Sequence, residues 1–182
     1  MIGTLELHKS QGKIQHVGLS NFSAEQIESA ACIAPIAAVE CGYNLLDRQQ
    51  NQAVVDTCIR NDIPVWCYGV LAQGLFSGKY GSRHNFPKHD RRSRLRHFRE
   101  GEVGRTQDLV SELTAIASQR DASPSQIAIQ LALQQPGVRT AIIGANNDQQ
   151  ITDNCAAASI ELTREEADRL TRIADAVAGR AK

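Results

Sequence analysis

Long apolar runs, an excess of charge of either sign, and cysteines at metal-binding spacing are all missing from this sequence. Its 20 basic and 20 acidic side chains give a formal net charge of zero, so no global field attracts it to nucleic acid or to a membrane. No apolar stretch approaches the roughly 20 residues of a membrane-spanning helix. Residues 1–13 are mixed polar and lack the apolar segment of a secretory signal. We therefore expect a cytoplasmic protein with no membrane or nucleic-acid partner.

The cysteines are odd in number and show no Cys-x-x-Cys spacing. They are Cys32, Cys41, Cys58, Cys67 and Cys155. Metal sites built from cysteine normally need closely spaced pairs, so we expect no metal site. Most of these thiols are expected to be small buried side chains in a reducing compartment.

The stretch from Gly12 to Ser23 contains the most informative pattern. Gly12 suits the position just past a helix end, and the apolar residues of 14–19 favour a buried strand. Ser20 and Asn21 place two short polar side chains where that strand ends. Ser23 with Gln26 forms a capping box, which predicts a helix over 24–34.

The rest of the chain continues to alternate strand and helix. Further apolar strands are expected at 37–41, 63–68 and 138–143. Helices are expected at 49–61, 106–119, 124–134 and 147–158, with a last one capped by Thr163 and Glu166. Apolar strands separated by helices indicate an α/β fold with a parallel sheet covered by helices.

The number of strands leaves two architectures open. A closed (β/α)₈ barrel takes about 250 residues and eight strands, whereas this chain has 182 residues and four expected strands. A four-stranded open sheet fits the length but leaves two strand edges to protect. Either a partial barrel or an open sheet would have an exposed face, so self-association is expected.

Several motifs are similar to those of the aldo-keto reductase family, in the family's order and spacing. They lie at 12–22, 41–48, 63–75, 123–128 and 141–145. The resemblance is to the branch that contains the potassium-channel β subunits and many bacterial reductases. It implies a parallel TIM-type barrel, of which residues 1–182 would form one partial domain. That domain would hold about the second half, strands five to eight and the C-terminal helix.

The resemblance also implies NADP(H) or NAD(H) as cofactor and hydride transfer between an aldehyde or ketone and the alcohol. The family's catalytic Asp, Tyr, Lys and His precede the matched region, and none of these positions exists in this sequence. We therefore expect no catalytic residue here and no turnover by this chain alone, with pairing to a missing N-terminal half as one possibility. A nonenzymatic nucleotide-binding or assembly module, and an inactive truncated or split-gene product, are the alternatives.

Four positions match the family's nicotinamide site. By resemblance, Ser20 and Asn21 bind the carboxamide, and Tyr68 stacks on the ring. Glu40 stands where the family usually has Gln, and an ionised carboxylate only accepts hydrogen bonds whereas an amide also donates. Without the resemblance, Ser20–Asn21 would be read as a helix start and Tyr68 as a core aromatic.

Other positions match the family's phosphate and adenosine sites. Those of the pyrophosphate loop are Gly69, Leu71, Gln73 and Gly74; those near the adenosine are Gly144, Asn146, Gln150, Asp153 and Asn154. A glycine turn before a helix N-terminus suits an anion, although an ordinary capped helix explains the same pattern. Asn146 lacks the charge of the Arg that this branch often has there to hold a 2′-phosphate.

A long basic loop is expected at about 75–104. Residues 82–100 include seven positively charged side chains and two negatively charged ones. The positive residues are Arg83, Lys88, Arg91, Arg92, Arg94, Arg96 and Arg99. Aromatic residues are not interleaved among them as in nucleic-acid binding segments, so a solvated loop near the cofactor phosphates is the preferred interpretation.

Overall fold

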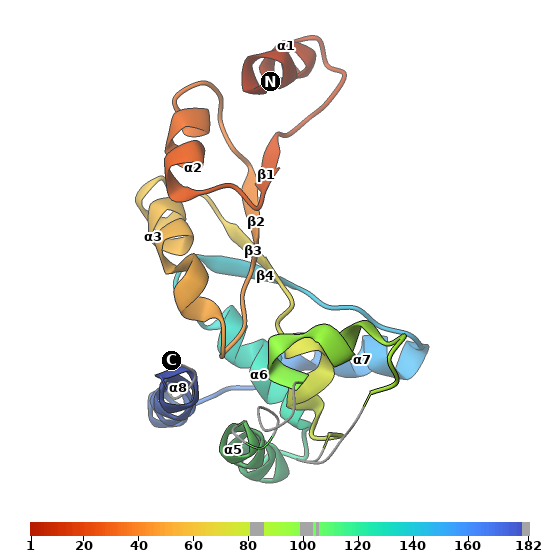
Figure 1. Ribbon diagram of the computed structural model, residues 1–182. Coiled ribbons are helices and arrows are strands. Elements are labelled where there is room, and N and C mark those ends of the chain that lie inside the picture. The colour runs from red at the N-terminus through yellow and green to blue at the C-terminus, as the bar shows by residue number, and fades with distance from the viewer. Residues whose placement is uncertain (81–85, 99–103, 105, 180–182) are drawn as a thin grey trace.

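A four-stranded parallel sheet forms the centre of the computed structural model (Figure 1). The strands are β1 (Gly18–Ser20), β2 (Ala38–Gly42), β3 (Val65–Tyr68) and β4 (Val138–Ile142), in the order β1-β2-β3-β4. The structure describes residues 1–80, 86–98, 104 and 106–179. The predicted α/β fold with a parallel sheet is confirmed, and in the described residues this sheet is open, with β1 and β4 at its edges.

The helices alternate with the strands as the sequence predicts. They are α1 (Ile2–Ser10), α2 (Ala24–Ala31), α3 (Gln52–Arg60), α5 (Gln107–Ser118), α6 (Pro124–Leu133), α7 (Asp148–Ala156) and α8 (Arg164–Gly179). Helix α2 stops three residues before the predicted end because Pro35 disfavours helical backbone at the residue preceding it. The predicted helix 147–158 finishes as a 3₁₀ turn, η5 (Ala157–Ser159).

The predicted helix caps are present. Ser23 and Gln26 exchange side-chain and backbone hydrogen bonds at the start of α2, and Ser123 and Gln126 do the same at α6. Gly12 has a φ of +70°, the left-handed conformation expected past the end of α1. These local signals fix where α2 and α6 begin and where α1 ends.

The two faces of the sheet have different surroundings. On one face, Leu19, Val39, Val65 and Cys67 are buried in a core that extends to helix residues such as Ile27. Helices α2 and α3 lie together on one side of the strands in Figure 1. On the other face, called the open face from here on, side chains of β3 are solvent-accessible. The open face is where a ligand can reach the strands.

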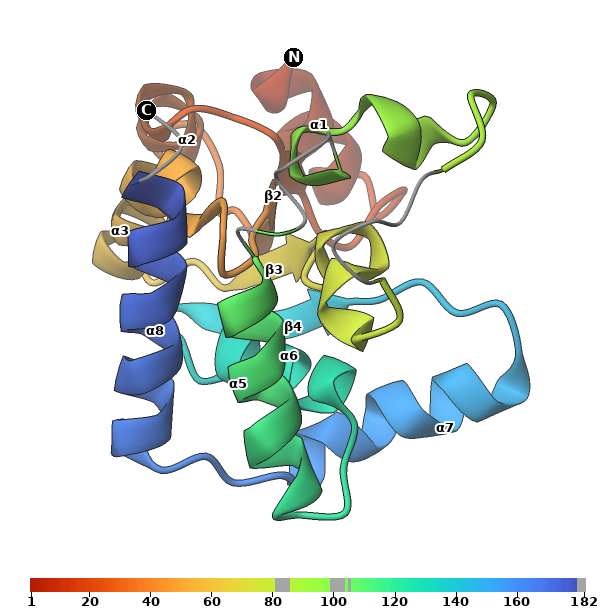
Figure 2. The same cartoon turned by 60° about the horizontal axis from the view of Figure 1, so that its bottom comes forward.

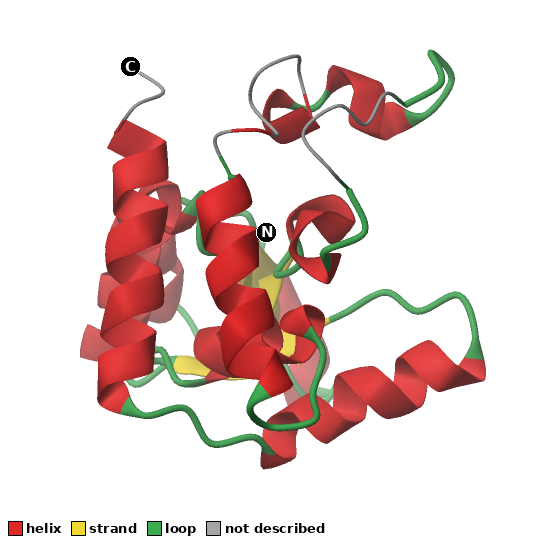
Figure 3. Cartoon of the chain, turned by 90° about the horizontal axis from the view of Figure 1, so that it is seen from below, coloured by secondary structure: helices red, strands yellow, loops and turns green. Residues whose placement is uncertain are grey.

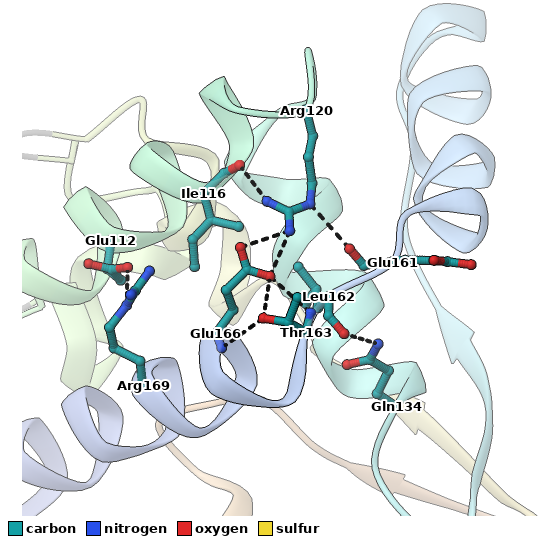
Figure 4. Close-up of polar contacts among 9 residues, drawn as sticks. All are labelled: Glu112, Ile116, Arg120, Gln134, Glu161, Leu162, Thr163, Glu166 and Arg169. Atoms are coloured by element: carbon teal, nitrogen blue, oxygen red, sulfur yellow. Dashed lines mark hydrogen bonds and ion pairs between the residues drawn. The ribbon is translucent and has the colours of Figure 1, made fainter.

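A second core lies among α5, α6 and α8, with Leu109, Ile127 and Leu170 fully buried. Helices α5 and α8 run side by side in Figures 2 and 3. Their polar contacts are drawn in Figure 4, where the Arg120 guanidinium lies between Glu166 and the Glu161 carbonyl. Arg169 of α8 also donates to Glu112 of α5 at 2.6 Å. These contacts hold the C-terminal helix against the rest of the fold.

Part of the basic segment is tied down. The Arg92 guanidinium donates to both carboxylate oxygens of Asp90, at 2.6–3.1 Å, and lies 4.3 Å from the Phe86 ring centroid. Two 3₁₀ turns, η3 (Arg91–Arg94) and η4 (Arg96–Phe98), lie within the predicted basic loop. Arg83 and Arg99 lie outside the described residues, as does Glu100. In the described part, the charge of Arg92 is therefore used within the segment.

Candidate functional site

The predicted nicotinamide residues meet at the carboxyl ends of β1 and β3. The Tyr68 hydroxyl donates to Asn21 Oδ1 at 2.8 Å, and Asn21 Nδ2 donates to Ser20 Oγ at 3.2 Å. Asn21 has a φ of 59°, a left-handed conformation that Asn tolerates better than most residues. The structure thus brings Ser20, Asn21 and Tyr68 into one hydrogen-bonded chain of side chains.

Gly42 makes room for the ring of Tyr68 in this arrangement. A Cβ atom at Gly42 would lie 3.4 Å from Tyr68 Cζ and from its hydroxyl oxygen. Gly42 and Tyr68 are aligned partners in β2 and β3. The ring therefore crosses over the backbone of β2 to reach β1, and it is 36% exposed. An accessible aromatic ring at the ends of three strands can stack against a flat ligand.

Glu40 precedes Gly42 by two residues in β2, so it lies further from the carboxyl ends of the strands than Tyr68 does. The sheet aligns Ser20 with Glu40, and Glu40 with Trp66, so these side chains share the open face. Glu40 also fixes the backbone of the site, because its carbonyl accepts from the Asn21 N–H at 2.9 Å. The predicted residue Glu40 is thus next to the Ser20–Asn21–Tyr68 group.

Trp66 is a site residue that sequence reasoning missed. It is 44% exposed and lies on the open face beside Glu40. The sequence suggested only a buried strand at 63–68. The usable signal was the period of two in a strand, which places Trp66 on the same face as Tyr68.

The predicted pyrophosphate loop has an unusual backbone. Gly69 has a φ of +70°, and Ala72, Gln73 and Gly74 follow with φ values of 47°, 59° and 91°. These three residues lie in the 3₁₀ turn η2 (Ala72–Ser77), where the N–H groups of Ala72 and Gly74 donate to Gly69 and Leu71 carbonyls. Two non-glycine residues in left-handed backbone cost free energy, and such strain is common at ligand sites.

The predicted adenosine residues lie in the segment before α7 and along that helix. Asn147 caps the helix by accepting from the Gln150 N–H at 2.9 Å, and Gln150 Oε1 accepts from the Asn146 N–H at 2.7 Å. Asp153 accepts from Gln149 through Oδ1 and from Gln126 through its carbonyl. Gly144 has open space around it, and Asn154 lies on the same helix. Gly144 and Asn146 lie in the extended segment that joins β4 to α7 (Figure 2).

Titratable side chains beneath the sheet are held neutral. Burial raises the pKa of the Cys67 thiol to about 12 and that of the Cys41 thiol to about 11. Burial likewise raises the pKa of the Tyr43 hydroxyl to about 12. At neutral pH these groups are protonated, so they supply neither a thiolate nucleophile nor a phenolate base.

No cluster of three or more His, Cys, Asp or Glu side chains in the described residues could hold a metal ion. None of the helices in this part of the chain has the length and apolarity needed to cross a bilayer.

The chain is similar to known aldo-keto reductases. The profile of the aldo/keto reductase family matches residues 1–175. Aldo-keto reductase str7 of Strobilurus tenacellus is 28% identical over 96% of this chain, and YhdN of Bacillus subtilis is 31% identical over 77%. The NADP(+)-designated yakc of Schizosaccharomyces pombe is 27% identical over 90%. The matches take up 53%, 43% and 49% of those proteins, so the chain spans about half the length of the curated relatives it matches.

Solved structures give the same result. Glycerol dehydrogenase AKR11B4 from Gluconobacter oxydans superposes with a TM-score of 0.88 at 28% identity, covering 94% of this chain and 52% of that one. Aldo-keto reductase AKR11C1 from Bacillus halodurans, at 22% identity and a TM-score of 0.71, supports the fold. Since the family profile extends over nearly all of the sequence, the chain belongs to the aldo/keto reductase family.

Proposed function

We propose that this chain is the cofactor-binding part of an NAD(P)(H)-dependent aldo-keto reductase. The observation that supports the proposal most directly is the Tyr68–Asn21 hydrogen bond. It joins predicted nicotinamide residues at the carboxyl ends of β1 and β3. In such an enzyme the cofactor supplies or accepts a hydride, and the protein binds and orients it. Substrate would be an aldehyde or ketone.

The residues present fit a nicotinamide. Gly42 leaves the Tyr68 ring space to lie across the strand ends, where it can stack on a flat ring. Ser20 Oγ can donate to or accept from a carboxamide, and Asn21 can do the same through its amide. We assign Gly69, Leu71, Gln73 and Gly74 to the pyrophosphate. Gly144, Asn146, Gln150, Asp153 and Asn154 are assigned to the adenosine end.

Binding can be followed through Trp66, the only tryptophan in the chain. Its position on the open face predicts quenching of its fluorescence by NADP⁺ or NADPH. Replacing Tyr68 by Ala should raise Kd about tenfold or more, since stacking on an aromatic ring contributes about 1–3 kcal/mol per base. Leu7→Ala, which truncates an exposed apolar side chain on α1, is the matched control and should leave Kd unchanged. Absence of binding by calorimetry would contradict the proposal.

We propose binding without turnover by these 182 residues. The sequence has no positions that match the family's catalytic Asp, Tyr, Lys and His, so the acid that protonates the carbonyl oxygen is missing from the site. Steady consumption of NADPH with 4-nitrobenzaldehyde by this chain alone would show that this part of the proposal is wrong. A nonenzymatic nucleotide-binding role makes the same binding prediction, and adding a separately expressed N-terminal reductase half distinguishes the two by restoring activity.

The choice between NADP(H) and NAD(H) depends on the surroundings of Asn146. A neutral amide lacks the bidentate fork of an Arg, so we expect little preference for the 2′-phosphate. Asn146→Arg should then raise affinity for NADP⁺ about tenfold with little change for NAD⁺, as a new charge-assisted hydrogen bond permits. Equal effects on both cofactors would place the adenosine elsewhere.

We also propose that the open face and the edges of β1 and β4 are covered in solution. Unpaired parallel edges are prone to pair with other strands, through self-association or pairing with another half of a barrel. Light scattering should therefore show more than a monomer, and a monodisperse monomer that unfolds cooperatively would argue against this. The free cysteines support our proposal of a reducing, cytoplasmic location.

A further inference from the structure

One charge stands out on the open face of the sheet. Glu40 is the one charged residue in β1, β2 and β3. In β4, Arg139 lies at the irregularity between the Val65 and Trp66 pairings, nearer the amino end of its strand. The half-buried Glu40 carboxylate has no hydrogen bond or ion pair with any residue that the structure describes.

Two exposed aromatic rings lie next to that carboxylate. Trp66 is aligned with Glu40 across the β2–β3 pairing, and Tyr68 is aligned with Gly42, two residues further along β2. A carboxylate beside exposed aromatic residues is the chemistry that recognises cations, above all flat or quaternary nitrogen cations. The neighbouring Ser20 adds a neutral polar group on the same row.

We propose that Glu40 makes this site prefer a positively charged ring, so that the oxidised nicotinamide, a pyridinium cation, binds more tightly than the neutral reduced ring. This inference rests on the proposed cofactor site. The carboxylate attracts the charged ring of the oxidised cofactor and has no such attraction for the neutral reduced ring. It therefore changes the affinity for the oxidised form relative to that for the reduced form. On the protein, tighter binding of the oxidised form favours transfer of hydride away from the reduced cofactor, toward a carbonyl.

The experiment compares Kd for NADP⁺ and NADPH by calorimetry, in the full chain at low ionic strength. The quantity measured is the ratio of Kd for NADPH to Kd for NADP⁺. Glu40→Gln should lower this ratio about tenfold, a difference of about 1.4 kcal/mol. Glu40→Asp keeps the charge and should preserve most of the preference. Glu165→Gln removes an exposed charge on α8, and should leave the ratio within about twofold of the wild-type value.

The outcomes separate this inference from the proposed function. If both forms bind and Glu40→Gln leaves their ratio unchanged, the role of Glu40 is wrong and the cofactor site stands. If neither form binds the wild-type chain, both fail. If Glu40→Gln does not fold, the Kd ratio of the wild-type chain is measured at two salt concentrations instead. Raising NaCl from about 0.05 to about 0.5 M shortens the Debye length severalfold and should reduce this ratio. An unchanged ratio would overturn the inference. Saturable quenching of Trp66 by 1-methylnicotinamide that is lost in Glu40→Gln would support it independently.

Discussion

The Tyr68 hydroxyl donates a hydrogen bond to Asn21 Oδ1 across the intervening strand β2, at 2.8 Å. Asn21 Nδ2 meanwhile donates to Ser20 Oγ, so both ends of the Asn21 amide have a partner. The orientation of that amide is therefore set before any ligand arrives. A carboxamide ligand would meet donors and acceptors already in place, which lowers the entropy lost on binding.

Asn21 offers the first prediction. Asn21→Gly keeps the left-handed backbone and loses the hydrogen bond, and should reduce the free energy of unfolding by about 1 kcal/mol. Asn21→Ala loses the bond and also forces Ala into left-handed backbone, and should cost about 2 kcal/mol or more. Urea denaturation measures both.

Tyr68→Phe removes the same hydrogen bond from the other side. If the bond stabilises the fold as proposed, combining Tyr68→Phe with Asn21→Gly should cost less than the two single changes added together, by about 0.5–1.5 kcal/mol. Strictly additive effects would mean that the two side chains do not interact in solution. Equal stability of the Gly and Ala variants would mean that Asn21 is not held in left-handed backbone.

Local patterns in the sequence were sufficient to predict the parallel sheet. Apolar strands that alternate with capped helices indicate a parallel sheet. The helix caps at Ser23 and Ser123 are present as predicted. Parallel strands also align their carboxyl ends at one edge of a sheet. This rule places Ser20 and Tyr68 at the same end of the sheet. Their assignment to one site came only from the family resemblance, because the residues alone would be read as a helix start and a core aromatic.

Contacts that depend on ring placement could not be predicted. Nothing local indicates that Tyr68 crosses over Gly42, or that Arg92 packs against Phe86 instead of remaining solvated. The left-handed run at Ala72 and Gln73 contradicts the preference of both residues, so only tertiary contacts impose it. Single-sequence patterns carry no information on such contacts.

Gly137 carries the second prediction. Its φ is +82°, and a Cβ atom there would lie 2.8 Å from Ile59 Cγ1. Its carbonyl also accepts from the Val65 N–H at 2.9 Å, so any shift is transmitted to β3. Gly137→Ala combines left-handed strain with overpacking and should destabilise the fold by about 2–4 kcal/mol, measured by chemical denaturation.

The clash and the strain can be separated. Ile59→Ala removes the side chain that the new methyl group would meet, and Ile59 is 45% exposed, so the single change should cost little. In the Gly137→Ala/Ile59→Ala double variant the clash is relieved and about 1–2 kcal/mol of backbone strain remains. No recovery in the double variant would show that Ile59 is not the limiting contact.

The third prediction concerns the reactivity of the cysteine thiols, which is measured by thiol titration. Cys32 and Cys155 are exposed, whereas Cys41, Cys58 and Cys67 are buried. Burial raises the pKa of Cys58 to about 11, as it does for Cys41, so the buried thiols are scarcely ionised at pH 8. Ellman's reagent should modify two thiols quickly in the native chain and all five in urea. Rapid reaction of a third thiol in the native state would contradict the burial of Cys41, Cys58 and Cys67.

Glu166 predicts how stability depends on pH. Burial by itself would raise the pKa of its carboxyl group, but hydrogen bonds from the Thr163 N–H, the Arg120 guanidinium and the Thr163 hydroxyl lower it below the ordinary value. The native state therefore keeps Glu166 ionised at pH values where the unfolded chain has begun to bind a proton. Its contribution is complete above the unfolded pKa of about 4.3 and is lost as pH falls through the lower, folded-state pKa.

Glu166→Gln tests this linkage and the clamp drawn in Figure 4. The glutamine retains an acceptor for the Thr163 N–H and loses the charge that pairs with Arg120 at 2.6 Å. The variant should have a lower melting temperature at pH 7, and the difference should shrink as pH is lowered below about 4, because wild-type Glu166 is then also neutral. Glu165→Gln, one residue away and exposed, is the matched control and should show neither effect. A difference in melting temperature that stays constant from neutral to acidic pH would mean that the Glu166 charge does not stabilise the packing of α8 on α5.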